Sequence, residues 1–293
     1  MALVIAGDGS AKLATEIARR LSAPLLSVEF KVFPDGEDYV RLLGNVKGED
    51  VIVVQTTFPP HRYWRLLLIL DACREAGAAK VRAVVPYLAY ARQDRIFQAG
   101  ESLSARVVGE TLSNLCAQIV TVDVHKEDIR TFFRIPFTNI SAEEPLSREL
   151  DRLGVQVVLA PDAGARPRAE AIGKRIRVQV DHLEKKRITS EMVEMTPKSL
   201  NVSGKSVAIV DDIISTGGTM AKALEQLKKN GARDVYAVGV HGLFLGEAVQ
   251  KLTAAGAKDL IATDTVETKY SRVTVADQIV GALRAPLPAI AKR

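Results

Sequence analysis

The sequence has few aromatic residues, only two cysteines and no long apolar run. Phe, Trp and Tyr make up 5% of its 293 residues, so the hydrophobic cores must be largely aliphatic. Cys73 and Cys116 lie in apolar segments of helical pattern and lack C-x-x-C spacing, which favours buried thiols in a reducing compartment. The longest apolar run, Leu66–Leu70, is far too short to span a bilayer. These absences argue against a transmembrane helix and a cysteine-based site.

No block of one charge is present either. The chain has 40 Lys and Arg against 35 Asp and Glu, and the two signs are interleaved. A nucleic-acid binder would show a basic stripe or an aromatic platform, and neither is visible. The modest excess of positive charge fits a small polyanionic substrate better. No signal-peptide pattern precedes the first strand. We therefore expect a cytoplasmic protein that binds neither nucleic acid nor membranes.

The chain does contain short β-branched runs that alternate with helical patterns. Such alternation predicts an α/β fold with mostly parallel sheets flanked by helices. The expected strands are Leu3–Ala6, Val51–Gln55, Val81–Val85, Ile119–Val122, Val157–Ala160, Ser206–Val210, Val235–Val240 and Leu260–Thr263. The expected helices are Ala11–Leu21, Tyr63–Ala76, Ser102–Leu115, Pro145–Leu153, Arg166–Arg175, Thr219–Asn230 and Gly246–Ala255.

The pattern also repeats along the chain. The same spacing separates Val4–Asp8 from Val158–Asp162 and Val81–Val84 from Val235–Val238, which predicts two similar α/β domains in tandem. We place them at residues 1–142 and 143–293. The sequence leaves open whether the C-terminal segment, which includes Val275–Leu283, packs back on the first domain.

The most informative motif is Val-Ala-Ile-Val-Asp-Asp-Ile-Ile-Ser-Thr-Gly-Gly-Thr at 207–219. Its apolar run predicts a buried strand that ends at Val210, with Asp211 and Asp212 directly after it, and a turn of small residues then leads into a helix. Glycines let backbone N–H groups approach a phosphate closely, and a helix N-terminus adds partial positive charge. Carboxylates repel phosphate but suit sugar hydroxyls or a hydrated divalent cation. The motif therefore predicts a sugar-phosphate site.

All positions of this motif resemble the phosphoribosyl-pyrophosphate (PRPP) motif of type I phosphoribosyltransferases and PRPP synthetases. It is neither a P-loop nor a dinucleotide fingerprint, whose spacings differ. The resemblance implies that Asp211, helped by Asp212, orients the hydroxyls of ribose 5-phosphate. It also implies that the 5-phosphate is bound by the loop residues Ser215, Thr216, Gly217, Gly218 and Thr219.

Two further segments of the C-terminal half match PRPP synthetases. Asp162 and Gly164 follow a predicted strand, where ligands bind in open α/β sheets, and resemble the family's pyrophosphate loop. A charge run usually marks a solvated surface. Here it contains Lys185-Lys186-Arg187, which resembles the family's catalytic Lys-x-Arg. The match implies that Lys185 is the main transition-state cation and Arg187 a phosphate clamp. The polar stretch 189–201 is typical of a mobile lid.

The N-terminal half carries features that a simple phosphoribosyltransferase does not need. Phe33-Pro34-Asp35-Gly36-Glu37 predicts a hairpin turn. By resemblance, Asp35, Gly36 and Glu37 bind ATP from a hairpin that a neighbouring subunit contributes, with Phe33 near the adenine.

Three other residues complete the implied ATP side. Arg92 and Gln93 would contact ATP, and His125, together with Asp162, would hold the magnesium-bound nucleotide. Because Mg²⁺ prefers oxygen donors, direct ligation by His125 stays open. Taken singly, the arginine could be a surface residue and the histidine a hydrogen-bonded one. Their joint occurrence in family order favours an ATP site.

The resemblance covers essentially the whole chain and is strongest to archaeal PRPP synthetases. It implies a homo-oligomeric, Mg²⁺-dependent ribose-phosphate diphosphokinase that converts ATP and ribose 5-phosphate into PRPP and AMP. Ser215 replaces a usual acid, and 96–101 replaces a basic stretch, which puts the bacterial ADP-inhibition site in doubt. The alternatives are a phosphoribosyltransferase that uses PRPP and a non-catalytic regulatory paralogue.

Overall fold

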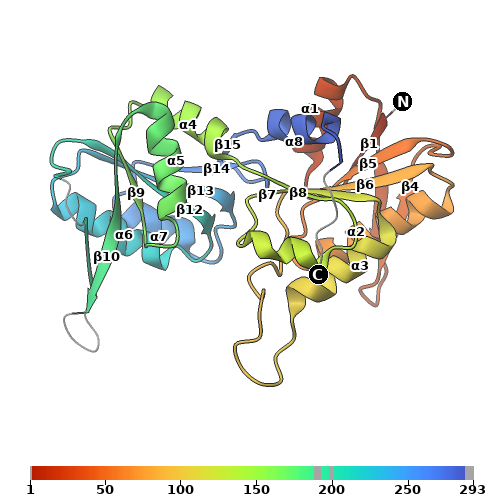
Figure 1. The fold of residues 1–293 in the computed structure, drawn as a ribbon, viewed down its shortest axis with the longest axis horizontal. Helices are drawn as coiled ribbons and strands as arrows, with labels where there is room; N and C mark the ends of the chain where they lie inside the picture. The colour runs from red at the N-terminus through yellow and green to blue at the C-terminus, as the bar shows by residue number, and fades with distance from the viewer. Residues whose placement is uncertain (1, 188–192, 198–200, 288–293) are drawn as a thin grey trace. The chain divides into compact units, whose positions relative to one another are not determined.

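The computed structural model describes residues 2–187, 193–197 and 201–287, with side chains described for 2–182 and 201–287 (Figure 1). The described chain divides into two compact units. Unit 1 comprises residues 2–141, 265–267 and 275–287, and unit 2 comprises 142–264 and 268–274. Each unit has a sheet with helices packed against it, which confirms the predicted α/β class.

Unit 1 contains a six-stranded parallel sheet in the order β2-β1-β5-β6-β7-β8. Its central strands β5, β6 and β7 are rich in Val and Ile, and only the first residues of β5 and β6 are not buried, as expected for parallel strands covered on both faces. The strands are β1 (Ala2–Ala6), β2 (Leu25–Leu26), β5 (Asp50–Val54), β6 (Lys80–Val85), β7 (Gln118–Val122) and β8 (Phe137–Ile140). The helices are α1 (Ala11–Leu21), α2 (His61–Glu75), α3 (Ser104–Leu115), the 3₁₀ helix η1 (Glu127–Phe132) and α8 (Ala276–Arg284).

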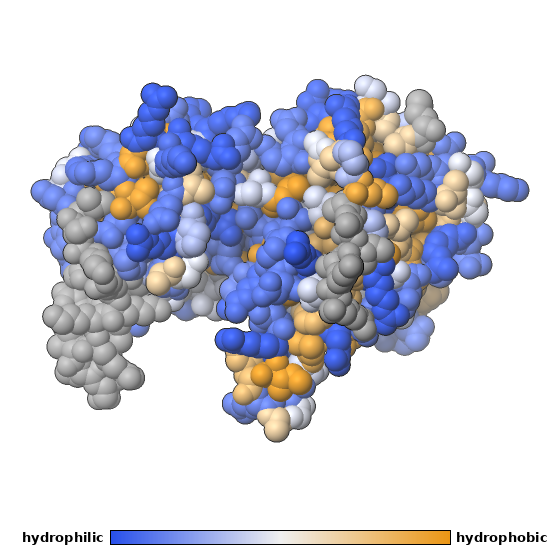
Figure 2. All heavy atoms as spheres, viewed as in Figure 1, coloured by the Kyte–Doolittle hydropathy of each residue, from blue (hydrophilic) through white to orange (hydrophobic). Residues whose placement is uncertain are grey.

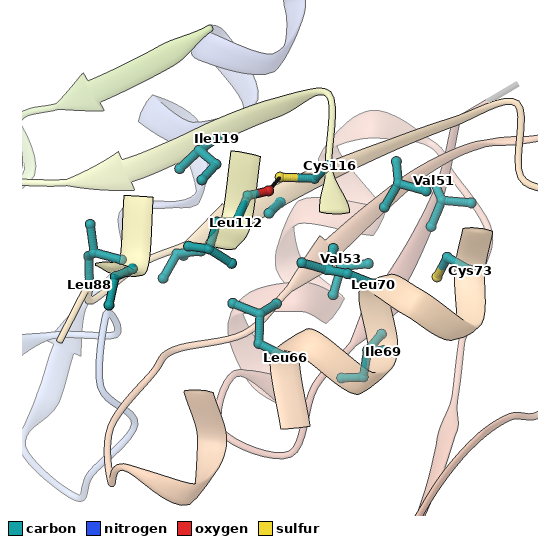
Figure 3. Close-up of a cluster of buried hydrophobic side chains, with 14 of the residues drawn as sticks. Val51, Val53, Leu66, Ile69, Leu70, Cys73, Leu88, Leu112, Cys116 and Ile119 are labelled. Atoms are coloured by element: carbon teal, nitrogen blue, oxygen red, sulfur yellow. Dashed lines mark hydrogen bonds between the residues drawn. The ribbon is translucent and has the colours of Figure 1, made fainter. Parts of the chain in front are cut away.

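The core of unit 1 is aliphatic, as the low aromatic content predicts. Leu66, Ile69 and Leu70 of α2 pack with Val51 and Val53 of β5 (Figure 3). Full burial of one such side chain is worth ~2 kcal/mol. Both cysteines are buried and free, and burial raises the pKa of each thiol to about 12. No helix among the described residues is both long and apolar enough to cross a membrane.

The C-terminal helix α8 belongs to unit 1 rather than to the unit that precedes it in sequence. Arg20 of α1 binds Asp277 at 2.7 Å through Nε. Arg82 of β6 donates two hydrogen bonds to the carboxylate of Asp50, at 3.0 and 2.9 Å, and a third to the carbonyl oxygen of Leu283 at 3.2 Å. This guanidinium therefore connects two neighbouring strands with α8.

We expect Arg82→Met to lower the free energy of unfolding by about 1–3 kcal/mol, because it leaves partly buried acceptors without their donor. Urea denaturation measures the change. Arg41→Met is the matched control, since Arg41 pairs with Glu29 at an exposed position where ion pairs contribute little. Equal losses in the two variants would contradict the prediction.

A separate antiparallel hairpin is formed by β3 (Val28–Val32) and β4 (Asp38–Leu42). Tyr39 pairs with Lys31 across it, and β4 lies against α2. The turn between the two strands is the Pro-Asp-Gly segment that the sequence predicted as a hairpin turn. The apolar side chains of the two hairpin strands pack on the core of unit 1, namely Val28, Phe30, Val40 and Leu42.

Unit 2 contains a seven-stranded sheet in the order β11-β10-β9-β12-β13-β14-β15. Only the β10–β11 pair is antiparallel among the described pairs of this sheet. Its strands are β9 (Val157–Ala160), β10 (Gln179–Arg187), β11 (Val193–Pro197), β12 (Ser206–Ile214), β13 (Asp234–Gly242), β14 (Asp259–Thr263) and β15 (Ser271–Val273). Its helices are α4 (Glu143–Arg152), α5 (Arg166–Ile176), α6 (Gly218–Lys229) and α7 (Ala248–Ala254).

The two sheets share one topology. The order β10-β9-β12-β13-β14-β15 in unit 2 repeats the order β2-β1-β5-β6-β7-β8 in unit 1. The strands with matching sequence spacing, β1 with β9 and β6 with β13, occupy equivalent positions. The sequence repeat is therefore a repeat of structure.

Candidate active site

The PRPP-like motif of unit 2 forms β12, a loop and the start of α6. The sequence predicted that the strand ends at Val210, and this is wrong. It continues to Ile214 because β12 and β13 stay in register, with Asp211 opposite Gly239 and Ile214 opposite Gly242. The two carboxylates therefore lie on the last part of a regular strand, and the small-residue loop begins after them.

The loop has the conformation that close contact with an anion requires. Gly217 caps α6 with φ 73°, a left-handed conformation that favours glycine. A Cβ atom there would lie 3.2 Å from Cγ of Leu252. Among the described residues no side chain caps this helix N-terminus, so its first N–H groups can bind a phosphate. Thr216, Gly218 and Thr219 are exposed, and Ser215 is half-buried.

Three carboxylates interact at this end of the unit 2 sheet. Burial and the neighbouring charge of Asp212 raise the pKa of Asp211 to about 7, and the charge of Asp162 adds to the effect. Asp162 follows β9 and accepts hydrogen bonds from the N–H groups of Gly164 and Ala165, at 2.9 and 3.2 Å. The carboxylate of Asp211 accepts a hydrogen bond from the N–H group of Asp212 at 2.9 Å. The structure thus brings these three predicted residues together.

The raised pKa makes stability depend on pH. Native Asp211 holds its proton to about pH 7 whereas the unfolded chain loses it near pH 3.8, so the native state binds more protons between these values and stability falls as pH rises. We expect Asp211→Asn to become progressively more stable than the original chain from pH 5 to pH 7. The gain should level off above pH 7 at ~1–3 kcal/mol. Urea denaturation without divalent cations measures it, and a gain independent of pH would contradict the prediction.

The predicted catalytic cations lie on β10. Lys185 is opposite Met195 of β11, and Arg187 is opposite Val193. Their side chains lie outside the described part of the structure. Of the stretch 189–201 that the sequence predicted as a mobile lid, residues 193–197 form β11. Residues 189–192 and 198–200 of that stretch lie outside the described residues.

In unit 1, four predicted ATP-binding residues share the β3–β4 turn. The N–H group of Phe33 donates to the carbonyl oxygen of Glu37 at 2.8 Å, and the side chain of Asp35 accepts from the N–H group of Glu37 at 3.1 Å. Gly36 has φ 94°. The turn is exposed, and the Phe33 ring contacts Tyr39 edge-on.

The other predicted ATP residues follow strands β6 and β7 of the six-stranded sheet of unit 1. Arg92 is exposed, and the Gln93 side chain donates to Glu101 at 3.2 Å. His125 is also exposed. Tyr90, two residues before Arg92, has φ 69°, and Asp123, two residues before His125, has φ 41°. Such strained residues occur often at functional sites.

The segment 96–101, which departs from the common family pattern, is a compact exposed loop. The carboxylate of Glu101 accepts hydrogen bonds from the N–H groups of Phe97 and Gln98, at 2.7 and 3.1 Å. Ile96 and Phe97 are exposed. The loop projects from unit 1, and hydrophobic side chains gather on the projection (Figures 1 and 2).

The predicted metal ligands are divided between the units, His125 in unit 1 and Asp162 in unit 2. Within the described residues, no group of three or more His, Cys, Asp or Glu side chains is placed to hold a metal ion.

Sequence reasoning also missed a cluster around Arg65 in unit 1. The one sequence feature that pointed to this cluster was the repeat that matches Asp8 with Asp162. Polar residues gather at the carboxyl ends of strands where ligands bind in α/β sheets.

Comparison with known proteins covers both units. Residues 2–115 match the N-terminal domain of ribose phosphate pyrophosphokinase, and residues 118–275 match the phosphoribosyl transferase domain. The ribose-phosphate pyrophosphokinases of Pyrococcus furiosus and Methanopyrus kandleri are each 41% identical to this chain over 96% of its length, covering 100% and 98% of their own. The crystal structure of phosphoribosylpyrophosphate synthetase from Mycobacterium smegmatis is similar with a TM-score of 0.85, 29% identity and 97% of each chain covered. The chain belongs to the ribose-phosphate pyrophosphokinase family.

Proposed function

We propose that this chain transfers the pyrophosphoryl group of Mg-ATP to the anomeric hydroxyl of ribose 5-phosphate, forming PRPP and AMP. The observation that carries the proposal is the family match over residues 2–115, which lies outside the phosphoribosyl transferase domain. A protein that only used PRPP would not need this part. Near-complete coverage of the archaeal relatives supports the same activity.

Unit 2 binds ribose 5-phosphate in this proposal. The 5-phosphate lies at the N-terminus of α6, where Ser215 and Thr219 add hydroxyl donors to the backbone N–H groups of the loop. Asp211, helped by Asp212, accepts hydrogen bonds from the ribose hydroxyls. Binding of a cationic or hydroxyl-rich ligand favours the ionised form of Asp211, which burial disfavours in the free chain.

Unit 1 contributes to ATP binding. The exposed Phe33 ring is suited to stack on adenine, and Asp35, Gly36 and Glu37 present polar groups beside it. Arg92 is suited to clamp phosphate oxygens, because a guanidinium binds them in a bidentate way. Gln93 is held by Glu101 and offers an amide.

Magnesium fits the carboxylates of unit 2 on chemical grounds. Asp211 and Asp212 provide hard oxygen ligands whose mutual repulsion a divalent cation would relieve. Asp162 and His125 contact the magnesium-bound nucleotide in this proposal. Mg²⁺ is commonly held by one or two carboxylates together with substrate phosphates, and when bound it neutralises charge on those phosphates.

The reaction is an in-line displacement at the β-phosphorus of ATP. The anomeric oxygen of ribose 5-phosphate forms a bond to that phosphorus, and the bond from it to the oxygen shared with the α-phosphorus breaks. AMP leaves with the shared oxygen. Lys185 and Arg187 stabilise the charge that spreads over the transferred group. The proton of the anomeric hydroxyl is released to solvent, and we assign no general base.

The purified chain with ATP, Mg²⁺ and ribose 5-phosphate should form AMP and PRPP in equal amounts, measured by chromatography of the nucleotides. If no AMP forms while PRPP and a purine base react, the chain is a phosphoribosyltransferase. If the chain is inactive alone but alters another synthetase, it is the regulatory paralogue. A homo-oligomer with the ATP site at a subunit interface and a cytoplasmic location both stay predictions.

A further inference from the structure

Unit 1 has a cluster of polar and charged side chains at the carboxyl end of β1 that the proposed mechanism does not use. Arg65 of α2 lies at its centre and donates from Nη1 to Asp8 at 2.6 Å and from Nε to Asp38 at 2.7 Å. Gln55 donates to the other oxygen of Asp8 at 2.7 Å. Arg62 lies beside the same carboxylate, with Nε at 3.5 Å.

This cluster lies at the end of the unit 1 sheet that corresponds to the end carrying the candidate site in unit 2. Strands β1 and β5 correspond to β9 and β12 in sheet order, so Asp8 corresponds to Asp162. The glycines on either side of Asp8 pack closely against the cluster, because a Cβ atom at Gly7 would lie 2.0 Å from Oε1 of Gln55 and one at Gly9 would lie 2.7 Å from Cδ of Arg62. The cluster connects parts of the protein that lie far apart in the sequence.

The parts that it connects are the sheet and the hairpin. Asp8 follows β1, whereas Asp38 begins β4 and directly follows Glu37 of the ATP-side turn. The Arg65 guanidinium also lies 5.5 Å from the ring of Phe30 on β3. The side chains of Arg65 and Asp38 are only 14% and 10% exposed. Hydrogen bonds from Gln55 and Arg65, with the charges of both arginines, outweigh the effect of burial and lower the pKa of Asp8.

Other ion pairs of the hairpin do not have this arrangement. Glu29 binds Lys31 at 2.9 Å and Arg41 at 2.7 Å, and all three residues belong to the hairpin itself. A two-stranded hairpin is marginally stable on its own, so the position of its turn depends on contacts with the rest of the unit. Arg65 supplies such a contact next to the turn, through a rigid fork that reaches two carboxylates at once.

We propose that Arg65 is a positioning residue for the ATP-side turn: by binding Asp8 and Asp38 together, it holds Asp35-Gly36-Glu37 in place relative to the sheet of unit 1. This inference rests on the proposed function, in which that turn contacts ATP. Arg65 itself touches no substrate in this account.

Steady-state kinetics of Arg65→Leu test the proposal. We expect kcat/KM for ATP to fall about 10- to 100-fold, because a small displacement of a binding turn costs that much, while KM for ribose 5-phosphate stays within about twofold. The kcat/KM for ATP of Arg65→Lys should lie between those of Arg65→Leu and the original chain, since one ammonium cannot reproduce a bidentate fork. Arg41→Leu, the matched control in the same hairpin, should change neither constant by more than about twofold.

Hydrogen exchange of the same variants gives a readout besides activity. In Arg65→Leu the amides of β3 and β4 should exchange faster while those of β5 and β6 keep their protection, and Arg41→Leu should leave both sets unchanged. Unchanged kinetics for ATP, or equal losses for both substrates with faster exchange throughout unit 1, would overturn the proposal. If the original chain forms no AMP, the proposed function fails, whereas faster exchange confined to β3 and β4 would still support the connection itself.

Discussion

Lys185→Ala should lower kcat by several orders of magnitude and leave the affinity for ribose 5-phosphate nearly unchanged. The reason is that this ammonium is expected to meet the transferred group mainly in the transition state, where the charge on its oxygens spreads. Single-turnover measurement of AMP formation gives the rate, and calorimetric titration with ribose 5-phosphate gives the affinity. Loss of rate without loss of affinity is the signature of an interaction made only in the transition state.

The adjacent residue provides the control for this prediction. Lys186→Ala removes the same charge at the middle position of the Lys-x-Arg pattern, to which the family resemblance assigns no role. Lys186→Ala should therefore keep kcat within a few-fold, as an ordinary solvated lysine would. If the two variants lose activity equally, or if Lys185→Ala keeps its turnover number, Lys185 has no part in the mechanism.

Asp211→Asn has the second largest expected effect, on binding. The amide keeps the shape of the carboxylate but replaces one acceptor oxygen with a donor, so hydrogen bonds from the ribose hydroxyls are lost. We expect the dissociation constant of ribose 5-phosphate to rise about 10- to 100-fold, corresponding to one or two charge-assisted hydrogen bonds. Calorimetric titration measures it.

The stability of this variant separates binding from folding. Above about pH 7 the variant should unfold at higher urea concentrations than the original chain, because the cost of the buried charge is gone. Glu225→Gln, on the exposed side of α6, makes the same change in net charge and should alter neither affinity nor stability appreciably. Unaltered affinity in Asp211→Asn would refute the assignment of this carboxylate to the sugar.

Where the hydrophobic pattern alone decides an element, the sequence predicted it well. Helix α1 and strand β9 have the bounds that were expected, Ala11–Leu21 and Val157–Ala160. The error at β12 has a different cause. Asp211 and Asp212 suggest the end of a strand because carboxylates are depleted in strands, but the pairs of Ile213 and Ile214 with β13 extend the strand past them.

In the candidate site, too, local features could be predicted from the sequence and contacts between distant segments could not. The phosphate loop could be predicted because contiguous residues form it, and its ligands are backbone N–H groups that a helix N-terminus supplies. The sequence could not predict that α8 and the segment 265–267 belong to unit 1. Their placement depends on contacts such as Arg20 with Asp277 and the backbone N–H of Lys12 with Glu267. No local pattern encodes contacts between segments that far apart.

By itself the sequence determined the fold class, the family and the location of the sugar-phosphate loop, because these depend on local pattern and on residue order along the chain. Only the tertiary structure decided two other properties. The pKa of Asp211 depends first on its burial, with the charge of the adjacent Asp212 and that of Asp162 after β9 adding to the effect. The environment of Arg65 depends on three elements meeting at one guanidinium. Both are electrostatic properties, and the energy of a charge is set by its burial and by all the groups around it in space, of which its neighbours in sequence are only a part.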